Sequence, residues 1–159
     1  MINKNTKVYC SFAKKAGNVG CKIFNSAFNY YELDAFYKSF SVNNIKDAIT
    51  SVKTLDIKGF AVTMPFKIEV VDYLDELKSG VQSIGAVNTV INDNGYLIGY
   101  NTDYLAAKEV LDECLGIDLY ILGNGGYSRA VQQAAKDLGY KPKMISRSNW
   151  KDIKNIKHS

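Results

Sequence analysis

The order of apolar and polar positions predicts a chain that alternates between short strands and helices. Apolar runs rich in β-branched and aromatic residues predict strands, whereas apolar positions three or four residues apart predict helices. The strands are expected at residues 6–12, 35–40, 59–64, 86–92, 96–100, 118–122 and 143–146. The helices are expected at residues 22–31, 43–53, 67–77, 103–115 and 125–138.

Three of these elements carry further local detail. In the helix 43–53, one face holds the apolar side chains, namely Ile45, Ala48, Ile49 and Val52. Asn94-Gly95 lies between two strands and predicts a hairpin, because Asn-Gly accepts the positive φ angles of a tight turn. In the helix 103–115, Asp103 is a candidate cap for the first turn. Its inward positions are expected to be Leu105, Val110 and Leu111.

Composition and charge narrow the class of protein. A hydrophobic fraction of 47% is typical of globular chains, and a net charge of +4 is too small to indicate a nucleic-acid or membrane partner. No apolar stretch approaches the roughly 20 residues of a membrane span, and the N-terminus lacks the pattern of a signal peptide. Cys10, Cys21 and Cys114 are widely spaced and odd in number, which favours a reducing, cytoplasmic compartment.

The side chains available for catalysis are restricted. The single histidine, His158, is next to last in the chain, so His-based triads and multi-histidine zinc sites are excluded. No metal site is expected, and any proton transfer must use Lys, Asp, Glu, Tyr or Cys. Only Arg129 and Arg147 are arginines, so bidentate recognition of an anion falls on those two.

A glycine-rich turn follows the strand 118–122 and leads into a helix. Gly123 permits a tight turn, Gly125 lets the backbone approach a pyrophosphate, and the helix start offers free N–H groups. Glycines that simply close a strand–helix turn are the alternative, but the strand before and the helix after favour nucleotide binding. The candidate cofactor-binding residues here are Gly123, Asn124, Gly125, Gly126 and Tyr127.

The end of the next strand indicates which dinucleotide is bound. In a dinucleotide-binding fold this position faces the adenosine ribose, where an acidic residue selects NAD and a basic one accommodates the phosphate of NADP. Here it reads Ser146, Arg147 and Ser148, with Lys151 shortly after. NADP is therefore the predicted cofactor, and a solvated basic strand end is the alternative.

Three further blocks lie at strand ends, where a scaffold presents side chains to a ligand. They span residues 62–67, 85–89 and 101–103 and contain Lys67, Asn88 and Asp103. On spacing alone, the pattern favours a surface lysine at Lys67 and a helix cap at Asp103 over functional roles.

Together these blocks resemble the shikimate dehydrogenase family. Residues 62–67 match its V-T-x-P-F-K block, 85–89 its G-A-V-N-T block and 101–103 its N-T-D block. The glycine-rich turn and the basic strand end follow in the family's order. The Met-Pro-Phe-Lys variant is most similar to the shikimate dehydrogenase-like branch.

The resemblance implies an α/β fold in two parts. Residues 1–102 would form a mixed-sheet substrate-binding domain. Residues 103–159 would form a linker helix and the first βαβ unit of a Rossmann NADP-binding domain. Since a complete domain takes roughly 100–150 residues, this Rossmann part is expected to be incomplete and the chain to be truncated at its C-terminus.

The resemblance also implies an activity and roles for particular residues. The reaction would be the reversible NADP-dependent oxidation of shikimate to 3-dehydroshikimate, in chorismate and aromatic amino acid biosynthesis. Lys67 would act as general acid and base, and Asp103 would orient the reacting hydroxyl. Thr63 and Asn88 would bind the ring hydroxyls, and Ser11 would contact the carboxylate of this small-molecule substrate.

The chain departs from the family pattern at three positions. Ala13 replaces the second serine of a Ser-x-Ser block, Ala61 replaces an asparagine, and Phe24 replaces the histidine of a His-Asn pair, leaving Asn25. Two alternatives therefore stay open. The chain binds shikimate or a nucleotide without turnover, or it acts on quinate or a related hydroxy acid.

Overall fold

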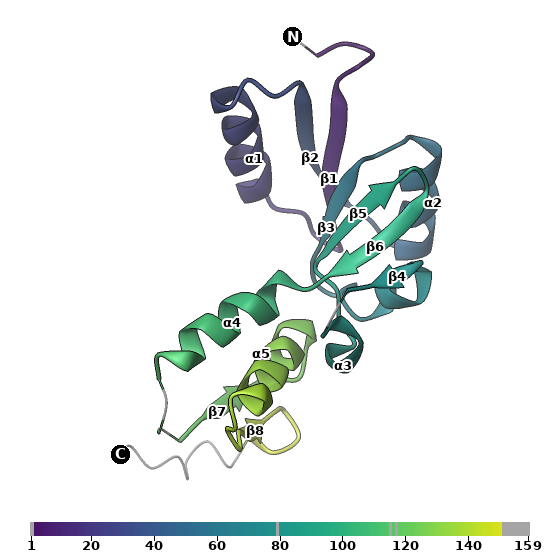
Figure 1. Cartoon of the computed structure of the whole chain (residues 1–159). Coiled ribbons are helices and arrows are strands. Elements are labelled where there is room, and N and C mark those ends of the chain that lie inside the picture. The colour runs from purple at the N-terminus through teal and green to yellow at the C-terminus, as the bar shows by residue number, and fades with distance from the viewer. Residues whose placement is uncertain (1, 79, 115, 117, 151–159) are drawn as a thin grey trace. The chain divides into compact units, whose positions relative to one another are not determined.

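The computed structural model describes residues 2–78, 80–114, 116 and 118–150 (Figure 1). The chain divides into two compact units, Met1–Tyr100 and Asn101–Ser159. The boundary falls where a strand ends at Tyr100 and Asn101 begins to cap a helix. Across the described ranges, no helix is both long enough and apolar enough to cross a bilayer.

The first unit is built on one six-stranded sheet with the strand order β2-β1-β3-β5-β6-β4. Its strands are β1 (Lys7–Ala13), β2 (Ala35–Ser41), β3 (Gly59–Val62), β4 (Glu76–Leu77), β5 (Thr89–Asp93) and β6 (Tyr96–Tyr100). β1 runs parallel to β2 and β3, β5 runs antiparallel to β3 and β6, and β4 runs parallel to β6. The sheet confirms the predicted mixed α/β class.

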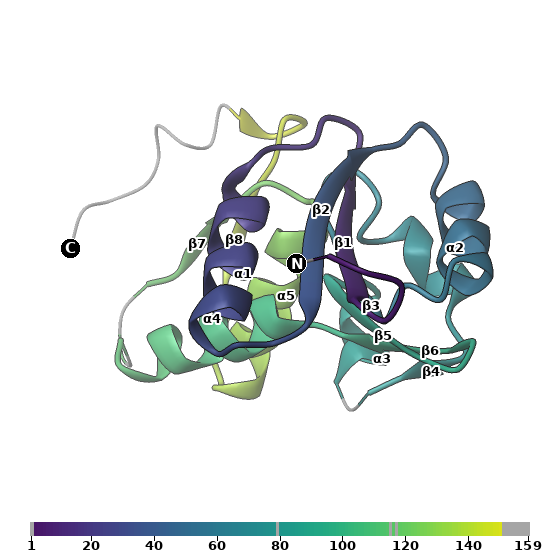
Figure 2. The same ribbon diagram turned by 90° about the horizontal axis from the view of Figure 1, so that it is seen from above.

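Helices cover both faces of this sheet. α1 (Val19–Tyr30) packs on the β1–β2 part of one face, and α2 (Ile45–Thr54) lies on the other face (Figure 2). Shorter elements follow, namely the 3₁₀ helix η1 (Glu69–Tyr73) and the single-turn helix α3 (Val81–Ile84), which the apolar pattern did not predict.

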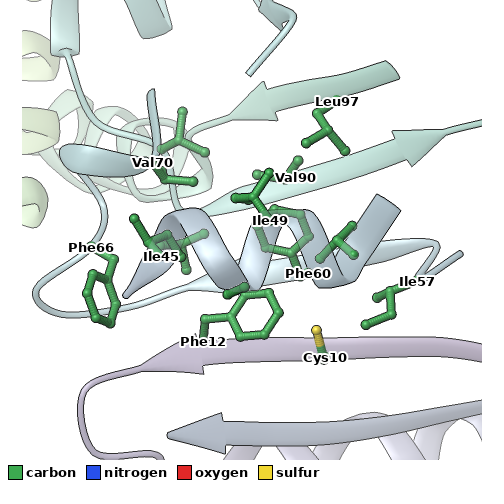
Figure 3. Close-up of a cluster of buried hydrophobic side chains, with 14 of the residues drawn as sticks. Cys10, Phe12, Ile45, Ile49, Ile57, Phe60, Phe66, Val70, Val90 and Leu97 are labelled. Atoms are coloured by element: carbon green, nitrogen blue, oxygen red, sulfur yellow. The ribbon is translucent and has the colours of Figure 1, made fainter. Parts of the chain in front are cut away.

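The main apolar core lies between the sheet and α2. Phe12 from β1, Phe60 from β3 and Val90 from β5 gather around Ile45 and Ile49 of α2 (Figure 3). The helix begins two residues after the predicted start at residue 43, because the Asn44 side chain caps it by accepting hydrogen bonds from the first-turn N–H groups. The predicted inward face of α2 is confirmed, since its buried residues are Ile45, Ala48, Ile49 and Val52.

The predicted hairpin is confirmed between β5 and β6. Asn94 and Gly95 have φ angles of 52° and 93°, as a tight turn between two antiparallel strands requires. The Asn92 side chain supports the turn by accepting a 2.7 Å hydrogen bond from the Gly95 N–H. This turn sets the register in which Thr89 lies opposite Tyr100.

The predicted helix at residues 67–77 is wrong. Residues 64–68 form a turn, η1 covers only five residues, and β4 follows. The chain leaves the helical path because its backbone pairs with β6 instead: the N–H groups of Asp75 and Lys78 donate to the carbonyls of Leu97 and Gly99. Lys67 therefore lies in a turn before η1 and does not open an α-helix.

The second unit is a β-α-β arrangement preceded by a helix. Its elements are α4 (Thr102–Asp112), β7 (Tyr120–Leu122), α5 (Gly126–Asp137) and β8 (Lys143–Ile145). β7 and β8 pair in parallel, as expected of the first βαβ unit of a Rossmann domain. A small core joins α4 to α5 through Ala107, Leu111, Ala134 and Ala135.

Two predictions for α4 need correction. Leu105 and Val110 are exposed, because the helix packs on α5 through the face that carries Ala107 and Leu111. Asp103 is not the cap either. The Asn101 side chain caps α4 by accepting the Tyr104 N–H at 3.0 Å, and Asp103 lies in the first turn.

Candidate functional site

The ends of several strands meet at one edge of the sheet in the first unit. β1 and β3 are parallel, so their carboxyl ends share that edge, and the antiparallel β5 begins there. The Thr63 N–H donates to the Phe12 carbonyl at 3.0 Å. The Asn88 carbonyl accepts the Val62 N–H at 2.8 Å, and the Asn88 N–H donates to the Tyr100 carbonyl at 3.1 Å. Backbone hydrogen bonds therefore hold Thr63 and Asn88 at this edge.

Lys67 is tied to the same edge through its backbone. The turn after Thr63 is closed by the N–H of the buried Phe66, which donates to the Thr63 carbonyl at 2.9 Å. The Lys67 carbonyl then accepts the Val87 N–H at 2.7 Å, one residue before Asn88. Asn88 directly precedes β5, which begins at Thr89, so the predicted strand start at residue 86 is wrong. Thr63, Lys67 and Asn88 are thus brought together by the fold.

Ser11 lies next to this edge on β1 and is buried, with a relative exposure of 8%. It is in register with Ser39 on β2 and with Ala61 on β3, and Ala61 is in register with Thr89 on β5. The Ser11 hydroxyl donates to the Ser39 hydroxyl at 3.0 Å. Ser39, Ser11 and Thr89 thus place three hydroxyl groups in one row across the sheet, which we call the hydroxyl row. Ser39 and Thr89 were not among the predicted site residues.

The α1 helix is attached to the free edge of β2 by polar side chains. The Asn25 amide donates to the Tyr37 carbonyl and accepts the Tyr37 N–H, both at 2.8 Å. The Cys21 sulfur accepts the Ser39 N–H at 3.2 Å. Phe24 stacks on the Tyr37 ring at 4.5 Å between centroids. Cys21 and Asn25 are four residues apart, so they share one face of a helix. This spacing is the sequence feature from which a polar contact of α1 could have been predicted.

The titratable groups near Ser11 respond to burial and to these hydrogen bonds. Burial raises the pKa of the Cys10 thiol to about 12. The hydroxyl and the N–H of Ser39 lower the pKa of Cys21, and Lys38 lowers it further. Burial raises the pKa of Tyr37, while a hydrogen bond with Ser11 acts in the opposite direction. Among the described residues, no group of three or more His, Cys, Asp or Glu side chains gathers to hold a metal ion.

A cavity of about 460 Å³ borders the hydroxyl row. Phe24 and Phe28 of α1 line one side, and Tyr37, Ala61 and Thr89 line the sheet side. Its lining is largely apolar, so polar contacts to a ligand in this region must come from the hydroxyl row and the sheet edge.

The glycine-rich turn in the second unit has an open backbone. Gly123 has a φ of +103°, which explains the need for glycine, and its N–H donates to the Ile145 carbonyl at 2.7 Å. The Ser128 hydroxyl donates to the Gly123 carbonyl at 2.8 Å. A Cβ atom placed on Gly123 or Gly125 would meet nothing within 4 Å. α5 starts directly after Gly125 without a side-chain cap, and Asn124 and Tyr127 are exposed beside it.

The loop after β8 is organised by a residue that the sequence pattern did not single out. Asn149 accepts the Ser146 N–H at 2.6 Å and donates to the Met144 carbonyl at 2.9 Å. The hydroxyls of Ser146 and Ser148 are 2.7 Å apart, and Arg147 between them is exposed. Lys151, the remaining predicted cofactor residue, lies outside the described residues, as does His158.

Comparisons with known proteins agree with this architecture. A family profile described as the shikimate dehydrogenase substrate binding domain matches residues 18–90. The chain is 36% identical over 154 residues to a shikimate dehydrogenase-like protein of Haemophilus influenzae, covering 95% of this chain and 57% of that protein. It is 41% identical over 136 residues to the shikimate dehydrogenase (NADP(+)) of Pyrococcus furiosus, covering 82% of this chain and 50% of the relative.

A solved structure shows the same fold. The crystal structure of shikimate dehydrogenase from Aquifex aeolicus superposes with a TM-score of 0.84 at 34% identity, over 98% of this chain and 61% of that chain. The chain spans about half the length of the curated relatives it matches. The family profile covers part of the first unit, and the sequence identity and the fold extend over both units. The chain belongs to the shikimate dehydrogenase family.

Proposed function

We propose that this chain carries the substrate-binding part and the start of the NADP-binding part of a shikimate dehydrogenase-type oxidoreductase. The reaction would be the reversible oxidation of shikimate to 3-dehydroshikimate. The observation that carries the proposal is the convergence of Thr63, Lys67 and Asn88 at one sheet edge through backbone hydrogen bonds. The family membership of the chain supports it, as do relatives named as NADP-dependent shikimate dehydrogenases.

Lys67 is the proposed proton carrier. As the substrate hydroxyl becomes a ketone, its carbon loses a hydride and its oxygen loses a proton. The Lys67 amine takes that proton, and its ammonium form returns one in the reverse direction. Asp103, at the start of the second unit, would orient the hydroxyl by accepting its hydrogen bond. Thr63 and Asn88 hold the neighbouring ring hydroxyls, which positions the reacting carbon.

The second unit fits the phosphates of a dinucleotide. The open space above Gly123 and Gly125 lets a phosphate approach the backbone, and the uncapped N–H groups of α5 are available to bind it. The exposed Arg147, with the hydroxyls of Ser146 and Ser148, suits the additional phosphate of NADP. When bound, NADP would supply the hydride acceptor.

Binding without turnover is the second candidate. Ala13 and Ala61 present methyl groups on two strands of the proposed site, and each removes a hydrogen-bonding side chain that the family pattern has there. Losing such a group costs on the order of 1–3 kcal/mol if its partner stays unsatisfied. The same substitutions leave room for quinate or a related hydroxy acid as the ligand.

The test is turnover by the purified chain with shikimate and NADP, followed at the absorbance band of the reduced cofactor. Lys67→Ala is expected to lower the rate by about 10²-fold or more, because general acid–base catalysis contributes that much. Lys22→Ala, which changes an exposed lysine on α1, is the matched control and should leave the rate unchanged.

Calorimetry with shikimate separates the candidates. Binding together with Lys67-dependent turnover supports the dehydrogenase. Binding without turnover supports the second candidate, and tighter binding of quinate favours a related hydroxy acid. Absence of both binding and turnover overturns the proposal.

A further inference from the structure

Ser11 belongs to a cluster of three polar side chains on the α1 side of the sheet, namely Ser11, Ser39 and Cys21. Ser11 donates to Ser39 across the β1–β2 pair at 3.0 Å. The Cys21 thiol of α1 donates to the Ser39 hydroxyl at 3.3 Å. The cluster thus joins β1, β2 and α1, and its central atom is the oxygen of Ser39.

Ser39 is held in place from two directions. Its N–H donates to the Cys21 sulfur at 3.2 Å, while its hydroxyl oxygen accepts from both Cys21 and Ser11. α1 can approach this closely because Gly20 has no side chain, since a Cβ atom there would lie 3.1 Å from the Tyr37 ring. A residue whose hydroxyl makes two such contacts and whose N–H makes a third is confined to a narrow range of orientations.

We propose that Ser39 is a positioning residue for substrate recognition. In this role, its hydroxyl, in register with Ser11, orients Ser11 toward the carboxylate of a cyclic hydroxy acid and compensates for the hydroxyl absent at Ala13. This inference rests on the proposed function and adds a determinant of specificity from β2, a strand on which no site residue was predicted.

The chemistry of paired hydroxyls explains how Ser39 acts through Ser11. A hydroxyl both donates and accepts, so Ser11 donates to Ser39 when the site holds no anion. When a carboxylate binds, Ser11 turns its proton toward the carboxylate, and the Ser39 O–H donates to the Ser11 oxygen. Hydrogen bonds in such a chain polarise one another, by about 10–30% per bond. Ser39 keeps Ser11 hydrogen-bonded in both states, which a methyl group at position 39 cannot do.

The test is shikimate binding by calorimetry with Ser39→Ala, Ser39→Thr and the control Ser26→Ala, an exposed serine of α1. Ser39→Ala is expected to weaken binding about five- to thirtyfold, because an oriented hydrogen bond to a charged group is lost. Ser39→Thr keeps the hydroxyl and should restore most of the affinity, and Ser26→Ala should bind as the unchanged chain does. Where turnover is measured, KM rises while kcat stays constant, since the carboxylate does not react.

A double-mutant cycle distinguishes this role from general destabilisation. In a Ser11→Ala background, Ser39→Ala should bring less than about a twofold further loss, because Ser39 acts through Ser11. Full additivity of the two losses, or no loss in Ser39→Ala, overturns the inference while leaving the proposed function intact. Failure of the unchanged chain to bind shikimate overturns both.

Discussion

Gly99 on β6 has no room for a side chain. A Cβ atom there would lie 2.6 Å from Leu74 Cδ1 and 2.9 Å from Val87 Cγ2, and Val87 directly precedes Asn88 of the proposed site. The apolar periodicity of the sequence does not predict this close contact. From the sequence alone, a glycine within a strand indicates only a weak strand former.

We expect Gly99→Ala to lower the free energy of unfolding by about 1–3 kcal/mol, the usual cost of overpacking. Gly17→Ala is the control, because a Cβ atom at Gly17 meets nothing within 4 Å. Urea denaturation followed by circular dichroism measures both. Equal midpoints for the two variants would show that Leu74 and Val87 move aside without cost.

At the scale of elements, Asp75 attaches the segment between η1 and β4 to the start of β6. Its carboxylate accepts the Leu97 N–H at 2.7 Å and the Lys53 ammonium at 3.4 Å. The Leu97 N–H is the main reason that the pKa of Asp75 lies below its ordinary value of 3.8, and Lys53 adds to the effect. This attachment helps to explain why residues 74–77 join the sheet and do not continue η1.

Asp75→Asn is expected to destabilise the chain by about 1 kcal/mol at neutral pH, with the value limited by solvent screening of a side chain that is 36% exposed. A carboxylate whose pKa is lower in the folded state than in the unfolded state stabilises the fold at pH values above its unfolded pKa. This stabilisation is lost as the pH falls through its folded pKa. The difference between variant and parent should therefore shrink as the pH falls below 3.8. Asp72→Asn, on η1, is the control; a pH-independent difference would contradict the role of the charge.

At the scale of the whole molecule, each apolar cluster lies within one unit. The larger one joins β1, β3 and β5 to α2, and the smaller one joins α4 to α5. Leu111 is the largest of the buried side chains in the smaller cluster, where the others are alanines.

We expect Leu111→Ala to reduce the hydrogen-exchange protection of α4 and α5, with a cost of about 2–4 kcal/mol for the cavity it leaves. Amides of β1 and β3 should keep their protection, because the described residues of their core all belong to the first unit. Val52→Ala in α2 is the reciprocal variant. An equal loss of protection in both units after Leu111→Ala would show that they unfold as one cooperative body.

Local patterns in the sequence were sufficient for every strand of the described residues except β4, for the buried face of α2, for the β5–β6 hairpin and for the blocks that indicated the family. Each depends on residues close together in the chain, where periodicity, turn geometry and motif spacing act directly. The residues Thr63, Lys67 and Asn88 could be proposed from those blocks alone.

Only the tertiary structure decided which distant groups meet. The 67–77 pattern suited a helix, yet pairing with β6 converted its end into β4. Ser39 stands beside Ser11 solely because β1 and β2 pair in that register, and Asn25 reaches β2 because α1 packs on its free edge. Such contacts depend on the free energy of long-range pairing, which the sequence near each residue does not encode.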